Sequence, residues 1–169
     1  VGSEMCIRDR AYTAIENANL AIAGLRKYGN VENNAGMRYL LGEALVLRAL
    51  YYHDLVKAWG DVPARFQPIG ETGDVIKPKS DRDVIYRQII SDLEEAVNYV
   101  YWPNESGKTG LTTRVNKAFA YGLLARVCLS AAGYSQRPDE GQIGTGNVGQ
   151  NRRSRLTESG QAWGDGALY

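Results

Sequence analysis

The segment from about Asn34 to Trp59 limits the fold more than any other, because its apolar residues follow a helical period on two adjacent faces. The first stripe contains Met37, Leu40, Leu41, Ala44, Tyr51, Leu55 and Ala58, and the second contains Leu45, Ala49, Tyr52 and Val56. So wide an apolar arc predicts a helix that neighbours cover on more than one side. Gly60 and Pro63 predict its end.

Two further helices are predicted on either side of this one. The first runs from about 11 to 28, with Gly29 placed where a C-cap glycine belongs. The other opens at Ser80 and ends before Pro103. Ser80 and Asp83 have the spacing of a capping box, although aspartate is shorter than the usual glutamate or glutamine.

A fourth helix is predicted to begin after Thr112 or Thr113 as N-cap. From 118 to 132 its only charged residue is Arg126, which predicts a buried helix. Its length and that arginine argue against a membrane span. Cys128 is expected to be a small buried apolar residue within it.

Together these segments predict an all-α fold of antiparallel helix hairpins in a tetratricopeptide-like array. The two halves are too dissimilar to define a repeat, and no strict tetratricopeptide period is visible. Residues 11–134 form the predicted helical region. From 135 to 169 the chain is rich in glycine and lacks periodicity, which predicts a long loop or an interrupted continuation, and hence an incomplete domain.

The charge balance favours no polyanionic partner. Twenty Lys and Arg residues face nineteen Asp and Glu residues, so neither nucleic acid nor an anionic membrane surface is indicated. Cys6, Cys128 and the single histidine, His53, have no metal-ligand spacing, so we expect neither metal nor cofactor.

No catalytic residues can be nominated. Glu94 and Glu95 are adjacent on a helix and point in different directions, so they cannot flank one glycosidic bond. The segment GTGNVG lacks the strand and helix that a dinucleotide site requires. The tail arginines are interpreted as a solvated loop: Arg152, Arg153 and Arg155.

Tyr101 and Trp102 are the candidate ligand-binding residues. They stand at a helix end beside the polar turn PNESGKTG. An exposed aromatic pair there could stack on a sugar ring. Alternatively, the pair caps the hydrophobic core of the hairpin, which the frequent burial of tryptophan favours.

The segment from Gly42 to Pro63, GEALVLRALYYHDLVKAWGDVP, resembles a recurrent motif of the SusD/RagB family. The matching positions are Gly42, Glu43, Ala44, Leu47, Arg48, Ala49, Tyr52, Leu55, Gly60, Asp61, Val62 and Pro63. Flanking stretches, AYTAIENANLAI before it and two helical segments after it, extend the resemblance over about 11–134. Within the motif, Glu43 and Arg48 sit in an apolar arc where an isolated charge is costly. Both are therefore expected to be paired and structural.

The resemblance implies an outer-membrane lipoprotein that captures glycans at the cell surface and works with a SusC-like TonB-dependent transporter, without catalysis. It implies no particular binding residue, because sugar contacts in the family lie largely in loops outside the helical scaffold. Two other functions stay open: a tetratricopeptide-like scaffold for protein partners and a helical-barrel carbohydrate enzyme.

The first ten residues, VGSEMCIRDR, have no place in that family pattern. From Val1 to Asp9 they match the translation of a transposase sequencing adapter. We therefore expect residues 1–10 to be an artefact and authentic sequence to begin near Ala11. The lipid anchor and signal peptide that the family implies are then expected upstream of this sequence.

Overall fold

The computed structural model describes residues 2–72, 77–107, 109–110 and 113–132. Its elements are α1 (Gly2–Tyr28), α2 (Ala35–Trp59), α3 (Ile69–Thr72), α4 (Arg82–Ala96) and α5 (Lys117–Ala132). The only β-type pairing among the described residues is an isolated bridge between Val62 and Ser80. The predicted all-α fold is confirmed.

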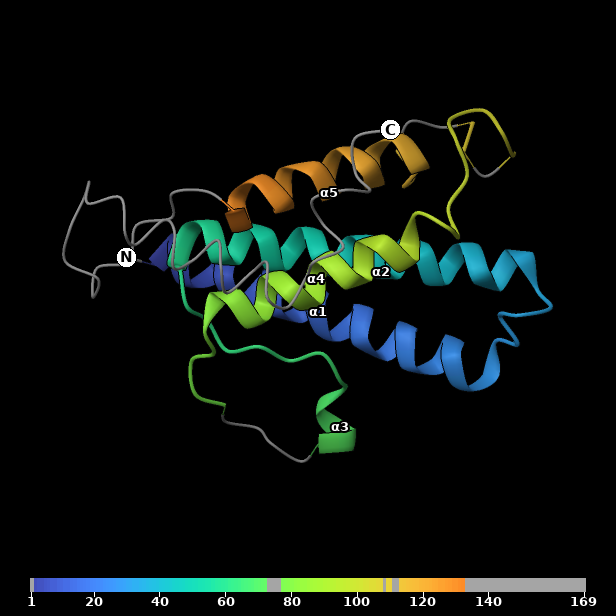
Figure 1. Ribbon diagram of the computed structural model, residues 1–169. Coiled ribbons are helices and arrows are strands. Elements are labelled where there is room, and N and C mark those ends of the chain that lie inside the picture. Colours follow the sequence, from blue (N-terminus) through green and yellow to red (C-terminus); the bar gives the residue numbers. More distant parts are fainter. Residues whose placement is uncertain (1, 73–76, 108, 111–112, 133–169) are drawn as a thin grey trace. The chain divides into compact units, whose positions relative to one another are not determined.

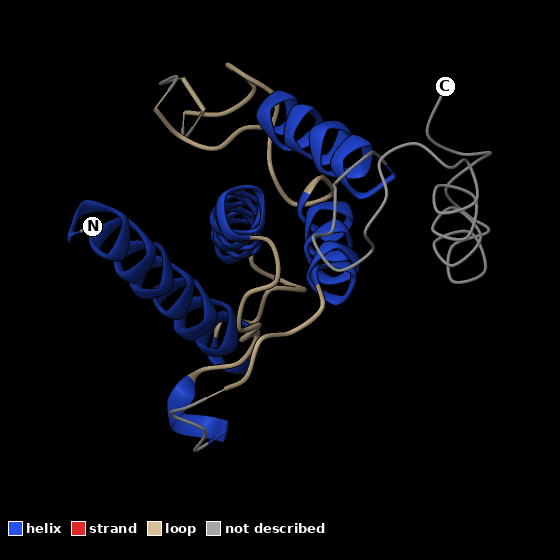
Figure 2. Ribbon diagram, turned by 90° about the vertical axis from the view of Figure 1, so that its left-hand side faces the viewer, coloured by secondary structure: helices blue, strands red, loops and turns tan. Residues whose placement is uncertain are grey.

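Helix α2 is the centre of the hydrophobic core, with α1 against one side and α4 against another (Figures 1 and 2). The three helices alternate in direction along the chain (Figure 1). Apolar residues of all three are buried between them, among them Ile15, Ile22, Leu41, Leu45, Leu55, Ile85, Ile89 and Leu93. Helix α2 therefore has neighbours on two sides, as its wide apolar arc predicted.

Three helix starts differ from the predictions. Helix α1 begins at Gly2 instead of near residue 11, since residues 3–10 contain neither proline nor glycine. Helix α4 is capped by Asp81, whose carboxylate accepts from the Asp83 N–H at 2.8 Å, so the Ser80 capping box was wrong. Helix α5 follows Asn116, whose side chain accepts from the Phe119 N–H at 2.9 Å. Asn116 therefore replaces Thr113 as its cap, whereas Thr112 lies outside the described residues.

Ser80 has a different role because it pairs with the chain that leaves α2. Its N–H donates to the Val62 carbonyl at 3.1 Å, and its hydroxyl accepts from the Ala64 N–H at 3.3 Å. These bonds join the two ends of the segment that connects α2 to α4. Helix α3 lies in the outer part of that segment (Figure 1).

Helix α5 is not the buried helix that its composition predicted. Its buried positions form a single stripe: Ala120, Leu123, Val127 and Ala131. Phe119, Tyr121 and Leu129 are exposed, and Cys128 is half-buried instead of buried. An apolar helix is therefore covered along one face only.

Residues 1–127 form one compact unit and residues 128–169 a second. Of the second unit only the end of α5 is described. The predictions for residues 135–169, including GTGNVG and the tail arginines, lie outside the described residues. The domain boundaries after residues 10 and 134 stay predictions. Among the described helices, none has the length and apolarity that crossing a membrane requires.

Candidate functional site

The Gly42–Pro63 motif lies along α2 and its C-terminal turn. A Cβ atom added at Gly42 would lie 2.9 Å from Val100 Cγ1 and 3.0 Å from Tyr99 Cβ. Both distances are shorter than carbon atoms tolerate without a shift. Gly42 therefore permits the chain after α4 to approach α2 closely.

Arg48 is the centre of a buried polar network. Its Nε and Nη2 donate to the two carboxylate oxygens of Asp92, each at 2.8 Å. Its Nη1 donates to Asn19 Oδ1 and to the Phe66 carbonyl, both at 3.0 Å. Asp92 also accepts from Gln88 at 2.9 Å. The guanidinium thus joins α1, α2, α4 and the loop after α2 through four hydrogen bonds.

Gly60, Asp61 and Pro63 form the turn that leaves α2. Gly60 has a φ of +70°, a conformation that residues with side chains rarely adopt. The Asp61 carboxylate accepts from the backbone N–H of Arg82 at 3.2 Å and from its Nε at 2.9 Å. Burial alone would raise the pKa of Asp61, but the bonds and charge of Arg82 outweigh it and lower that pKa. The Pro63 carbonyl accepts from the Tyr12 hydroxyl at 3.1 Å.

Glu43 anchors the loop that precedes α5. Both its carboxylate oxygens accept from Arg114, one of them at 3.1 Å from Nε. The same guanidinium lies 5.6 Å from the centre of the Tyr39 ring. The Tyr39 hydroxyl donates to the Val115 carbonyl at 2.8 Å, and burial, followed by the charge of Glu43, raises the pKa of Tyr39. The expected pairing of Glu43 and Arg48 is present, and their purely structural role stays a prediction.

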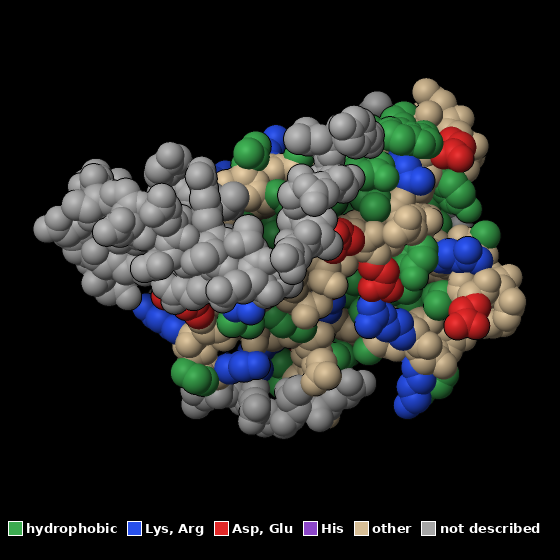
Figure 3. Space-filling model, in the orientation of Figure 1, with side chains coloured by type: hydrophobic (Ala, Val, Ile, Leu, Met, Phe, Trp, Pro, Cys, Tyr) green, Lys and Arg blue, Asp and Glu red, His purple; other side chains and the backbone are tan. Residues whose placement is uncertain are grey.

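Tyr101 and Trp102 have different environments although they are adjacent. Tyr101 is half-buried and stacks on Tyr39, with ring centres 5.5 Å apart and 12° between the planes. Trp102 is 49% exposed and stacks on Tyr121, itself 46% exposed, with ring centres 6.0 Å apart. Tyr101 therefore covers the hydrophobic core, while Trp102 presents its ring to solvent. Hydrophobic side chains gather over this loop and the start of α5 (Figure 3).

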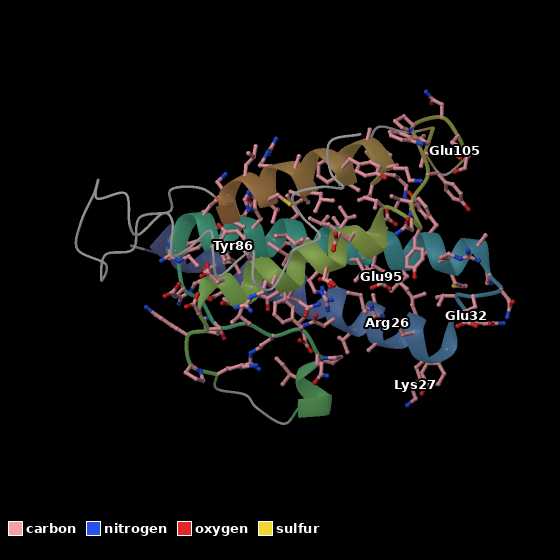
Figure 4. The ribbon with its side chains drawn as sticks, viewed as in Figure 1. Arg26, Lys27, Glu32, Tyr86, Glu95 and Glu105 are labelled. Atoms are coloured by element: carbon pink, nitrogen blue, oxygen red, sulfur yellow. The ribbon has the colours of Figure 1, made fainter. Side chains whose placement is uncertain are left out.

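The backbone of Trp102 is fixed by its own loop. Its N–H donates to Glu105 Oε2 at 2.6 Å, and its carbonyl accepts from Thr109 Oγ1 at 2.9 Å. At the base of the loop the Lys117 N–H donates to the Tyr101 carbonyl at 2.7 Å. Glu105 lies at the outer part of this loop (Figure 4). An exposed tryptophan held in this way is preorganised for a flat ligand, because little ordering is left to occur on binding.

We call Trp102 and Tyr121, with Lys117 beside them, the aromatic platform. The Lys117 ammonium lies 5.9 Å from the centre of the Trp102 ring. Aromatic faces stack on the apolar faces of sugar rings, and a neighbouring charge can bind polar substituents. The aromatic platform is thus the candidate ligand site of the described residues.

Several residues of these clusters were not found by sequence reasoning. Asp92 is a single acid among apolar neighbours in IISDL, and that pattern could have marked it as the partner of Arg48. Arg114 and Lys117 stand in a polar stretch with nothing to distinguish them. Tyr121 lies in a helix that was predicted to be buried, which gave no reason to expect an exposed ring there.

His53 is buried, and neither ring nitrogen has a hydrogen-bond partner within the part of the chain that the structure describes. Burial, followed by the charge of Lys57, lowers its pKa. It therefore stays uncharged near neutral pH. No group of three or more His, Cys, Asp or Glu side chains suited to a metal occurs among the described residues.

Known proteins resemble this chain in sequence and in structure. A family model, SusD-like and described as "Starch-binding associating with outer membrane", matches residues 7–129. SusD-like protein P38 of Formosa agariphila is 35% identical over 89 residues, which are 52% of this chain and 17% of that protein.

Two solved structures share the fold. A SusD superfamily protein from Parabacteroides distasonis is 30% identical, with a TM-score of 0.64 over 89% of this chain and 30% of its own. A laminarin-binding SusD-like protein is 25% identical, with a TM-score of 0.60 over 72% of this chain and 25% of its own. The chain spans less than a third of the length of each of these relatives.

Proposed function

The chain belongs to the SusD-like family, and we propose that it is part of a glycan-binding protein of the outer membrane surface. The observation that supports a ligand site at particular residues is the aromatic platform. There Trp102 is exposed, stacks on Tyr121 and has its backbone held by Glu105. In this proposal Trp102 stacks on a sugar ring, while Tyr101 stacks on Tyr39 and holds the start of the loop against the core. The similarity to a laminarin-binding protein supports an oligosaccharide as the ligand class.

The protein acts in nutrient uptake with a SusC-like TonB-dependent transporter and is held at the membrane by a lipid anchor. The family description, which associates such proteins with the outer membrane, supports this location. The test is copurification of the tagged protein with a defined transporter from outer-membrane extracts. Recovery of the protein without the transporter would contradict the partnership.

The protein binds its glycan without cleaving it. The similarity to a structure described as a binding protein supports this part of the proposal. After prolonged incubation, chromatography should return the bound oligosaccharide unchanged. Release of shorter products would instead identify a carbohydrate enzyme.

Calorimetry with laminarin oligosaccharides, alongside a panel of other glycans, tests the site. Trp102→Ala should weaken binding at least about tenfold, because it removes a central aromatic contact. Tyr28→Ala, which truncates another exposed aromatic at the end of α1, is the matched control and should leave binding unchanged. If none of the glycans binds, or if Trp102→Ala binds as well as the unaltered chain, the proposed site is wrong.

A further inference from the structure

Charged side chains of both signs lie at the loop and helix start that carry the aromatic platform. The Glu105 carboxylate is held by the Trp102 N–H, and the Glu43 carboxylate is ion-paired with Arg114. Lys117 forms no ion pair with another of the described residues. Its ammonium is therefore a cation beside the exposed ring that a ligand can use.

Lys117 is positioned to reach a ligand on the platform. Its backbone is fixed by the 2.7 Å bond from its N–H to the Tyr101 carbonyl, one residue before Trp102. Its side chain has a flexible stem, and the ammonium is 5.9 Å from the centre of the Trp102 ring. At an exposed site such a cation–π contact is weaker than a charge-assisted hydrogen bond to an anion. The ammonium can thus leave the ring for an acidic group of the ligand.

We propose that the aromatic platform binds an anionic sugar, with the ring stacked on Trp102 and its carboxylate or sulfate accepting hydrogen bonds from Lys117. A uronic acid and a sulfate ester share this chemistry, since both place a negative charge at the edge of the sugar ring. The proposal rests on the proposed glycan-binding function and specifies its ligand class. It requires that a neutral sugar gain only the stacking contact.

The experiment compares neutral, uronate-containing and sulfated oligosaccharides of equal length by calorimetry against the full chain. We expect the anionic members to bind most tightly, with affinity that falls as salt is raised. Lys117→Met should lower the affinity for anionic ligands about tenfold, because one charge-assisted hydrogen bond is lost. It should leave the affinity for neutral ligands unchanged. Lys117→Arg should retain the preference, and Lys27→Met removes an exposed lysine elsewhere as the control.

The outcomes separate this inference from the proposed function. If neutral glycans bind most tightly, or if Lys117→Met weakens both classes equally, the anionic preference is refuted while Trp102→Ala can still demonstrate the site. If Trp102→Ala has no effect, or if no glycan binds, both proposals fall. Whether uronate or sulfate binds more tightly identifies the acidic group.

Discussion

Replacing Arg48 with methionine tests the energetic role of the buried network. The side chains of Arg48 and Asp92 are 4% and 2% exposed, and Arg48 donates four hydrogen bonds. In Arg48→Met the Asp92 carboxylate would keep only Gln88, and Asn19 Oδ1 and the Phe66 carbonyl would each lose their Arg48 donor. Because one partner of a buried pair is left charged and desolvated, the free energy of unfolding should fall by about 3–5 kcal/mol.

The surface pair Arg26–Glu95 provides the control. It links α1 to α4 at 2.7 Å, with the two side chains 52% and 32% exposed (Figure 4). Solvent and salt screen such a pair, so Arg26→Met should cost at most about 1 kcal/mol. Both substitutions remove an arginine that forms an ion pair with α4. The difference between their costs in unfolding free energy therefore reports the effect of burial.

Urea denaturation, followed by circular dichroism, measures both changes and the double variant Arg48→Met/Asp92→Leu. The double variant should recover most of the loss, because no uncompensated charge remains in the core. A cost below about 1 kcal/mol for Arg48→Met would refute this reasoning. So would a double variant that is no more stable than Arg48→Met alone.

Three further predictions concern stability and are measured by the same denaturation. Gly42→Ala should lower the free energy of unfolding by about 1–3 kcal/mol, because the added methyl group clashes with Val100. Gly24→Ala, whose added methyl group meets nothing within 4 Å, should instead stabilise α1 by up to about 1 kcal/mol. As the pH falls through and below 6.5, the free energy of unfolding should decrease by at most about 1.4 kcal/mol per pH unit, because His53 takes up its proton in the unfolded state before it does so in the folded state. His53→Leu should remove this pH dependence. Tyr52→Phe should cost about 1–3 kcal/mol, since the hydroxyl both donates and accepts at 2.6 Å in the loop after α2; an unchanged midpoint would contradict this.

The packing of α1, α2 and α4 followed from sequence because local periodicity determined it. The two stripes of α2 required two neighbours, and the structure has them. The helix caps were less predictable. Ser80 and Asp81 are both good N-cap residues, and the choice depended on the Ser80–Val62 pairing, which is a tertiary contact.

The exposure of α5 was predicted wrongly for a related reason. Its composition gives an apolar surface on all sides, but burial depends on which neighbours lie against that surface. Tyr121 therefore could not be recognised as a partner of Trp102 from its position in the helix. The separate environments of Tyr101 and Trp102 were equally inaccessible, because Tyr39 lies far from both in sequence.

The motif that identifies the family and the residues that carry the proposed ligand chemistry lie in different parts of the chain. Gly42, Arg48 and Gly60 take part in close packing, a buried ion pair and a turn with positive φ. The platform residues Trp102 and Lys117 come instead from the loop after α4 and the first residue of α5, outside the motif. A substitution at Lys117 can therefore change the ligand without disturbing the scaffold. For this reason membership of the family identifies the fold but does not identify the glycan. The ligand class follows instead from the charges beside Trp102.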